Sequence, residues 1–302
     1  MARIPIIIDC DPGVDDALAL LLALASGDEL DLLGVTAVGG NVTLAKTQYN
    51  AQRTLALVGR EEVPVHAGST SPMLIDLHTT DVHGNDGIGG AVLPEPTVPL
   101  ASVNGVGYLN ESLAAQPGEI TLCCLGPLTN LGLAICNQES AFGGARRVVL
   151  MGGSSERGNV TAHAEFNFFV DPHAARLVFL SGADLVMIGL NLTRQVPISG
   201  ARMGQIAAVG TKAAKAAHEM LAVYGRSDTA MHDPCVIAYL LQPELFSGHR
   251  ALVDIEINDV ERMGQSVVRD IGEAGAANAL VLDKIDGDGF FDLLCERLGR
   301  LP

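Results

Sequence analysis

One stretch near the start of the chain constrains the fold more than any other. An apolar run over residues 4–8 is typical of a buried strand in a parallel sheet, and Pro12-Gly13 breaks it sharply. Asp15 and Asp16 follow where a helix would begin, so their charge meets the positive end of the helix dipole, and the apolar run over residues 17–24 supplies the helix body. The sequence therefore predicts a strand, a tight turn and a helix.

Four carboxylates crowd this corner within eight residues: Asp9, Asp11, Asp15 and Asp16. Carboxylates that close repel one another and raise each other's pKa unless a cation neutralises them, and oxygen-only ligands favour a hard ion such as calcium or magnesium. Capping and turn aspartates on a solvated loop would explain one or two of these residues, but not four flanked by apolar runs. We therefore predict a metal site.

The alternation of strand and helix continues along the chain. Strands are predicted at residues 30–38, 63–68, 119–125, 147–151, 185–192, 252–257, 265–270 and 277–283. Helices are predicted at residues 44–58, 103–115, 129–135 and 172–180, from residue 231, and at the end of the chain. A further helical stretch is predicted at residues 201–223, interrupted at Gly204 and Gly210. This pattern predicts an α/β fold with a mainly parallel central sheet flanked by helices. No linker or repeat divides the sequence, so we expect one domain over residues 1–302.

Polar clusters follow many of the predicted strands. They lie at residues 9–16, 39–41, 125–130, 151–153 and 191–193. Because ligands bind at the carboxyl ends of parallel strands, we expect these clusters to meet in one pocket. Residues 69–97 should form a long functional loop, in which His83 stands among glycines, either in a mobile lid or as an incidental surface histidine.

Composition excludes several classes of function. The net charge is −16, which would repel nucleic acid and anionic membrane surfaces. The longest apolar run, residues 17–25, is too short to span a bilayer, and the first residues lack the pattern of a signal peptide, so we expect a cytoplasmic location. The six cysteines have no CxxC spacing and are expected to be reduced thiols. Residues 283–292 look like a calcium loop, but their spacing fits no EF-hand register, which favours a turn before the last helix.

The sequence also resembles the inosine-uridine preferring nucleoside hydrolase family. The likeness begins at the motif over residues 9–16, Asp-Cys-Asp-Pro-Gly-Val-Asp-Asp. Further blocks follow in the family's order and at similar separations: Gly39-Gly40-Asn41, His83-Gly84, Gly126-Pro127-Leu128-Thr129-Asn130, Met151-Gly152-Gly153, Asn159, Glu165-Phe166-Asn167 and His232-Asp233-Pro234-Cys235. The resemblance covers residues 4–236, and more weakly the rest. It implies a Rossmann-like fold and a homo-oligomer, dimer or tetramer, that hydrolyses the N-glycosidic bond of ribonucleosides in purine or pyrimidine salvage.

The resemblance also assigns roles to individual residues. It implies Ca²⁺ held by Asp11, Asp16, Asp233 and the main-chain carbonyl of Leu125. It implies substrate contacts from Asp15, Asn41, His83, Met151, Asn159, Glu165, Asn167 and Tyr224. Asp11 would accept a proton from the attacking water, and His232 would donate one to the departing base, although His232 could instead be satisfied locally at the start of its helix.

The expected base preference and two alternative functions rest on a few further features of the sequence. With no Trp, the tryptophan-lined base stacking of the purine-specific branch is impossible, which favours a pyrimidine-preferring or broad enzyme. The short segment between Tyr224 and His232 and the presence of Asn191, where an aspartate was expected, depart from the family's pattern. Two alternatives are a calcium-dependent nucleoside-binding protein without turnover and, less favoured, a metal-dependent phosphatase, whose motif needs a Gly-Thr-type continuation after the second aspartate.

Overall fold

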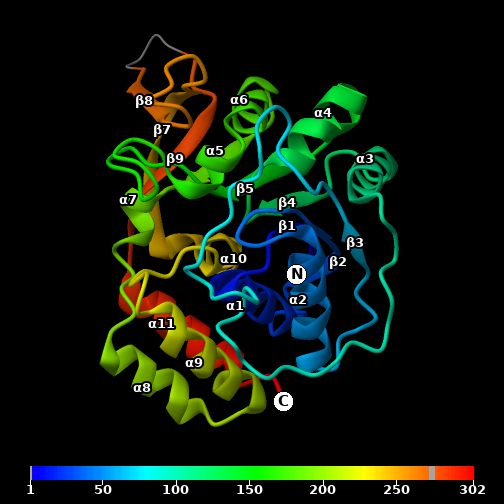
Figure 1. The fold of residues 1–302 in the computed structure, drawn as a ribbon, viewed down its shortest axis with the longest axis vertical. Coiled ribbons are helices and arrows are strands. Elements are labelled where there is room, and N and C mark those ends of the chain that lie inside the picture. The colour runs from blue at the N-terminus through cyan, green and yellow to red at the C-terminus, as the bar shows by residue number, and fades with distance from the viewer. Residues whose placement is uncertain (1, 272–275) are drawn as a thin grey trace.

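A nine-stranded sheet forms the centre of the computed structural model, which describes residues 2–271 and 276–302 (Figure 1). The strands are β1 (Ile4–Cys10), β2 (Leu30–Ala37), β3 (Val65–Ala67), β4 (Thr121–Cys124), β5 (Arg147–Met151), β6 (Leu185–Ile188), β7 (Phe246–Ile255), β8 (Ser266–Asp270) and β9 (Ala279–Ile285). Their order in the sheet is β3-β2-β1-β4-β5-β6-β9-β7-β8. The six pairings from β3 to β9 are parallel, and only β9–β7 and β7–β8 are antiparallel. The predicted α/β fold with a mainly parallel sheet is confirmed.

Helices cover both faces of the sheet. They are α1 (Val14–Leu24), α2 (Leu44–Leu57), α3 (Gly105–Ala115), α4 (Thr129–Phe142), α5 (Phe166–Val170), α6 (Pro172–Leu180), α7 (Leu190–Thr193), α8 (Gly200–Val209), α9 (Lys212–Tyr224), α10 (Pro234–Leu241) and α11 (Gly287–Leu298). Successive residues of β1 point to opposite faces, so Ile6 and Ile8 pack in one buried cluster with α1 and α10, and Ile7 packs in the other with α3, α4 and α6. β1 is therefore buried on both sides, as its unbroken apolar run predicts.

Three local predictions need correction. The strand predicted at residues 185–192 ends at Ile188, because Gly189 starts the short helix α7. The helical stretch at residues 201–223 is interrupted at Gly210, as predicted, where a φ of +79° ends α8 in the left-handed conformation, but not at Gly204, which lies within α8. The short helix α5 was not predicted, since its N-cap is Glu165 and glutamate is not one of the usual N-cap residues.

Residues 283–292 and the long loop at residues 69–97 have the structures expected from the sequence. Asp286 accepts hydrogen bonds from the backbone N–H groups of Asp288 and Gly289, so it is the N-cap of α11 and not part of a calcium loop. Residues 69–97 contain no helix or strand. Within residues 2–271 and 276–302, no helix is long and apolar enough to cross a membrane.

Candidate active site

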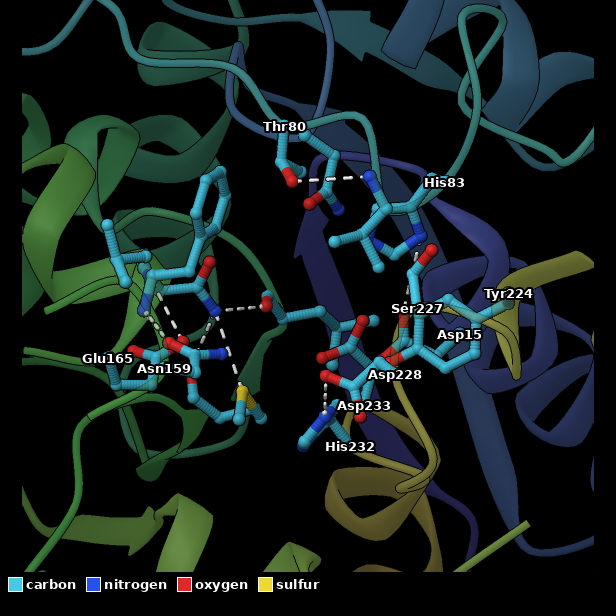
Figure 2. A pocket seen from close by; sticks show the side chains of 17 residues that line it. Asp15, Thr80, His83, Asn159, Glu165, Tyr224, Ser227, Asp228, His232 and Asp233 are labelled. Atoms are coloured by element: carbon cyan, nitrogen blue, oxygen red, sulfur yellow. Dashed lines mark hydrogen bonds and ion pairs between the residues drawn. The ribbon is translucent and has the colours of Figure 1, made fainter. Parts of the chain in front are cut away.

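A cavity of about 230 Å³ opens at the carboxyl ends of the central parallel strands. Most of the predicted site residues line it, as Figure 2 shows for several of them: Asp15, Asn41, His83, Leu125, Met151, Asn159, Glu165, Asn167, Tyr224, His232 and Asp233. Asp11 and Asp16 lie directly behind this lining and are buried. Residues far apart in the sequence are thus brought to one place. Of the five predicted polar clusters, the one at residues 191–193 lies outside the lining.

The buried aspartates are held together by Asn41 and the turn before α1. The backbone N–H of Asn41 donates to Oδ2 of Asp11 at 2.6 Å, and its side-chain amide donates to Oδ2 of Asp16 at 3.2 Å. The N–H of Gly13 donates to the same oxygen of Asp16 at 2.8 Å. Gly40 is required beside this centre, because an added Cβ would lie 2.1 Å from Oδ2 of Asp11.

The acidic centre has the chemistry of a hard-cation site. Carboxylate oxygens of Asp15, Asp16 and Asp233 all lie within 4.8 Å of one another, and Oδ1 of Asp11 is buried without a hydrogen-bond partner. Burial, with the neighbouring aspartates adding to it, raises the pKa of Asp11 and Asp233, and it raises the pKa of Asp15 to about 7. An oxygen-only donor set with an unpaired buried oxygen fits a calcium ion. The tightest set includes Asp15, which the resemblance places on the substrate, in addition to Asp16 and Asp233.

Asp9, the fourth carboxylate of the motif, is not part of this centre. Its Oδ2 accepts hydrogen bonds from the Thr36 hydroxyl and, at 2.7 Å, from the amide of Asn130. Oδ1 of Asn130 in turn accepts from the N–H of Ser69 at 2.8 Å. Asp9 therefore ties β1 to β2 and to the start of the long loop, a structural function within the crowded corner.

The opposite wall of the cavity carries amides and one carboxylate. The side-chain amide of Asn167 donates to the carbonyls of Leu125, at 2.7 Å, and Met151, at 3.1 Å. Glu165 accepts from the N–H groups of Gly153, at 2.8 Å, and Asn167, at 2.9 Å. These bonds use the amide nitrogen of Asn167 and leave its Oδ1 for a ligand. The wall is therefore fixed in place by the ends of β4 and β5 before any ligand binds.

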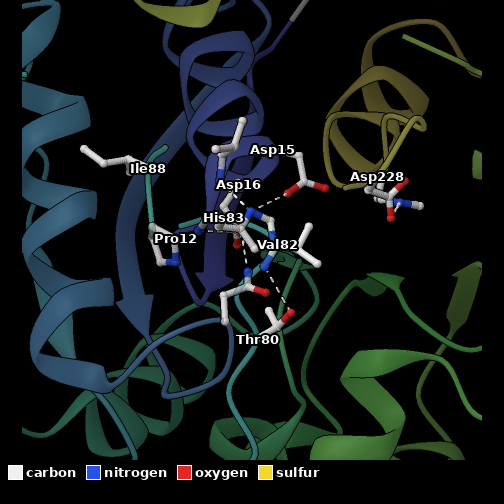
Figure 3. Close-up of polar contacts among 12 residues, drawn as sticks. Pro12, Asp15, Asp16, Thr80, Val82, His83, Ile88 and Asp228 are labelled. Atoms are coloured by element: carbon white, nitrogen blue, oxygen red, sulfur yellow. Dashed lines mark hydrogen bonds and ion pairs between the residues drawn. The ribbon is translucent and has the colours of Figure 1, made fainter. Parts of the chain in front are cut away.

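His83 is a buried part of the site and not an incidental surface residue. Its Nδ1 accepts the backbone N–H of Val14 at 3.0 Å, so His83 satisfies one of the free donors at the start of α1. Figure 3 shows His83 beside Asp15 and Asp16 of this helix. Burial, with His232 nearby, lowers the pKa of His83 to about 3. Because Nδ1 is the acceptor and the ring is neutral, the proton resides on Nε2. His83 can therefore only donate a hydrogen bond through its free nitrogen.

His232 is hydrogen-bonded at both ring nitrogens. Nδ1 lies 2.7 Å from the hydroxyl of Thr193, and Nε2 lies 3.2 Å from Oδ2 of Asp228. Burial alone would lower its pKa, but the carboxylates of Asp228, Asp15 and Glu165 together outweigh burial and the pKa of His232 is raised. His232 thus carries a positive charge more readily than a free histidine.

Sequence reasoning missed Asp228, and it placed residues 191–193 at the pocket without giving Thr193 a role. Thr193 belongs to α7, which was predicted as the end of a strand, and Asp228 lies in the short segment between Tyr224 and His232, without a recognisable motif. Thr80, Val82, Val160, Phe166 and Ser227 also line the cavity and were not predicted to do so. Asn191 lies outside the cavity lining, where its amide donates to the carbonyl of Leu282 at 3.1 Å.

Comparison with known proteins defines the class of this protein. The family model "Inosine-uridine preferring nucleoside hydrolase" matches residues 6–292. The pyrimidine-specific ribonucleoside hydrolase RihA of Shewanella woodyi is 40% identical over 305 residues, covering 97% of each chain. The chain belongs to the inosine-uridine preferring nucleoside hydrolase family, and it is a ribonucleoside N-glycosidase.

Solved structures agree with this assignment. The plant nucleoside hydrolase PpNRh1 superimposes with a TM-score of 0.88 at 30% identity, covering 98% of this chain and 99% of its own. A purine-preferring ribonucleoside hydrolase from Gardnerella vaginalis gives a TM-score of 0.91 at 27% identity, covering 98% of each chain. Enzymes with different base preferences thus share this fold.

Proposed function

We propose that this enzyme cleaves ribonucleosides to ribose and free base in a calcium-dependent reaction, with a preference for pyrimidines or a broad specificity. The observation that carries the proposal is the buried acidic centre formed by Asp11, Asp15, Asp16 and Asp233. This centre faces the cavity and has no arginine or lysine among its described ion pairs. A nucleoside-binding protein would need the pocket but not a buried proton acceptor behind it.

The chain's own residues supply most of what the reaction needs. Cleavage of an N-glycosidic bond passes through an oxocarbenium-like sugar, so negative charge near the ribose lowers the barrier. Asp11, Asp16, Asp233 and the Leu125 carbonyl would hold calcium, which when bound makes a water molecule more acidic and orients it. Asp11, with its unpaired Oδ1, is placed to accept the proton of that water.

The wall formed by Asn159, Glu165 and Asn167 would bind the ribose. Their positions are set by hydrogen bonds to the backbone, including that from the N–H of Phe166 to Oδ1 of Asn159 at 2.9 Å. Preformed contacts of this kind hold the sugar in the orientation for attack without a further loss of entropy. Met151 lies on the same wall and would pack against the sugar ring.

His232 would protonate the departing base, and its hydrogen bonds define how. Asp228 is ionised and can only accept, so Nε2 of His232 carries a proton. To reach the base, this proton must exchange the Asp228 contact for one to the substrate. His83 and Tyr224, whose rings lie 5.1 Å apart, form the adjoining wall on which the base would lie.

A base preference for pyrimidines has two supports. The chain has no Trp for stacking a purine, and a relative that it matches over 97% of its length is named as pyrimidine-specific. The structural neighbour named as purine-preferring shares the fold at lower identity, so fold alone does not select the base.

Incubation with uridine, inosine and p-nitrophenyl phosphate, with and without a chelator, tests the proposal. We expect ribose release from uridine, lost with the chelator and restored by calcium. Binding of uridine without ribose release would support the nucleoside-binding alternative, and hydrolysis of only the phosphate ester would support a phosphatase. The cytoplasmic location and the homo-oligomer stay predictions, for cell fractionation and light scattering to test.

A further inference from the structure

Asp228 is the most accessible charged side chain at the end of the cavity that holds the histidines. Its side chain is 26% exposed, whereas those of His232, His83 and Asp15 are 9%, 7% and 5% exposed. Asp228 lines the cavity directly. A ligand that enters this end therefore meets the Asp228 carboxylate before it meets any other charge.

The position of this carboxylate is fixed. Oδ2 contacts Nε2 of His232 at 3.2 Å, and Oδ1 accepts the backbone N–H of Ala230 at 3.0 Å. The short segment after α9 thus forms a turn that holds the side chain over the cavity. Each carboxylate oxygen can accept two hydrogen bonds, so both retain capacity for a ligand donor.

No lysine or arginine within residues 2–271 and 276–302 forms an ion pair with Asp228. Among the ion pairs of residues 2–271 and 276–302, its partner is His232 alone. Burial would raise the pKa of Asp228, but the hydrogen bond and charge of His232, with the N–H of Ala230, together outweigh burial and lower the pKa, so the group is ionised. A half-buried carboxylate with spare acceptor capacity favours a ligand that brings an N–H or O–H donor and disfavours one that brings none.

The two ends of the cavity separate sugar from base. Figure 2 shows Asn159 and Glu165 on one side, and Asp228, His232 and Tyr224 on the other. If the proposed function holds, the ribose occupies the amide wall, and Asp228 is left to face the base. We propose that Asp228 is a specificity-determining residue that accepts a hydrogen bond from an N–H of the base, such as N3–H of uracil or the amino group of cytosine.

Uridine and 3-methyluridine test this directly, because they differ at that N–H. We expect the wild-type enzyme to prefer uridine in kcat/KM by about 10- to 100-fold, the range of a hydrogen bond to a charged group. Asp228→Ala should lower kcat/KM for uridine by a similar factor and that for 3-methyluridine much less, so the preference collapses. Asp228→Asn, which keeps the shape, should lower the uridine value while the protein stays folded.

Two controls make the test specific. Asp270→Asn removes the same charge from another Asp–His pair, at His249 and 2.9 Å, outside the cavity, and should leave both kcat/KM values unchanged. 5′-Deoxyuridine tests the sugar: Asp228→Ala should reduce its turnover by the same factor as that of uridine. A loss that vanishes with 5′-deoxyuridine would place Asp228 on the ribose and overturn the proposal.

The remaining outcomes separate this inference from the proposed function on which it rests. Equal losses on uridine and 3-methyluridine in Asp228→Ala would show that Asp228 acts only through His232, and would overturn the proposal while leaving the hydrolase intact. Equal turnover of the two nucleosides by the wild-type enzyme would overturn it in the same way. A wild-type enzyme that cleaves no nucleoside would overturn both.

Discussion

His232 in the cavity and His249 on the antiparallel side of the sheet each lie against aspartates, but in different surroundings. His232 is 7% exposed and contacts Asp228 at 3.2 Å. His249 in β7 bridges Asp283 in β9, at 2.6 Å, and Asp270 in β8, at 2.9 Å, with its side chain 42% exposed. The pKa is raised in both, at His249 by the hydrogen bond that it donates to Asp283 and at His232 by Asp228, Asp15 and Glu165 together, against the effect of burial.

A similar comparison holds for carboxylates. Asp184, which directly precedes β6, is paired with Arg147 of β5 at 2.7 Å and Arg250 of β7 at 3.0 Å. In the cavity, Asp11 and Asp16 are buried with other acids, and no described arginine or lysine lies within ion-pair distance of them. What distinguishes the site is burial without a neutralising cation. Such a centre gains from a bound ion, whereas Asp184 is already neutralised by its two arginines.

The largest effect is expected from Asp11→Asn. The change removes both an expected calcium ligand and the expected proton acceptor, so turnover of every nucleoside should fall by at least about 10⁴-fold. Asp270→Asn is the matched change at the sheet edge and should leave turnover within about twofold, since exposed charges contribute little. Steady-state kinetics with uridine and inosine measure both. Near-normal turnover by Asp11→Asn would contradict the mechanism.

The second effect concerns the two histidines themselves. A purine can be protonated on its five-membered ring as it leaves, so His232→Ala should lower inosine turnover by about 10²- to 10⁴-fold, the usual contribution of a general acid. Uridine lacks that nitrogen and should lose less. His249→Ala is the control at the edge and should change neither rate. Small and equal losses on both nucleosides would mean that His232 only supports Asp233.

Features set by neighbouring residues were easier to predict from the sequence than features set by distant ones. The turn before α1 and the positions of β1, β2 and β5 follow from local patterns, because apolar runs, Pro12-Gly13 and paired aspartates act over a few residues. The outcome for Asp9 could not be predicted, since its partner Asn130 is 121 residues away in sequence. The cap that His83 provides to α1 and the contact of Thr193 with His232 likewise depend on packing between distant segments.

The third effect is the response of stability to calcium and pH. Burial raises the pKa of Asp15 from 3.8 to about 7, so between these values the metal-free folded state binds more protons than the unfolded state. Stability without calcium should therefore fall as pH rises from 4 to 7. A calcium concentration a hundred times the Kd at pH 8 should restore about 2.7 kcal/mol there, and the same concentration should restore less at pH 5, where protons compete for the carboxylates. Thermal unfolding with calcium or chelator at the two pH values measures this, and a calcium effect independent of pH would contradict it.

The fourth effect is on ribose binding. Asn167→Ala removes an amide that contacts Leu125 and Met151 and faces the cavity, so transition-state binding should weaken by about 1–3 kcal/mol. The loss should shrink for 2′-deoxyuridine or 3′-deoxyuridine, whichever lacks the hydroxyl that Asn167 binds. Asn278→Ala is a matched control, because this amide donates to the carbonyls of Phe179 and Val253 near the sheet edge. An equal loss on all three nucleosides would assign Asn167 a structural function alone.

The smallest effect is expected at the exposed histidine. A histidine whose folded pKa is raised stabilises the protein fully below its unfolded pKa, and this contribution is lost as pH rises through the folded value. Since the side chain is 42% exposed, water screens the pair, and Asp283→Asn should cost only about 0.2–1 kcal/mol at pH 5.5. At pH 9, where His249 is neutral, the cost should approach zero. Urea unfolding of Asp283→Asn and wild type at both pH values decides this. A cost that grows with pH would show that the edge pair behaves unlike a solvent-screened ion pair, and the contrast with the cavity would fail.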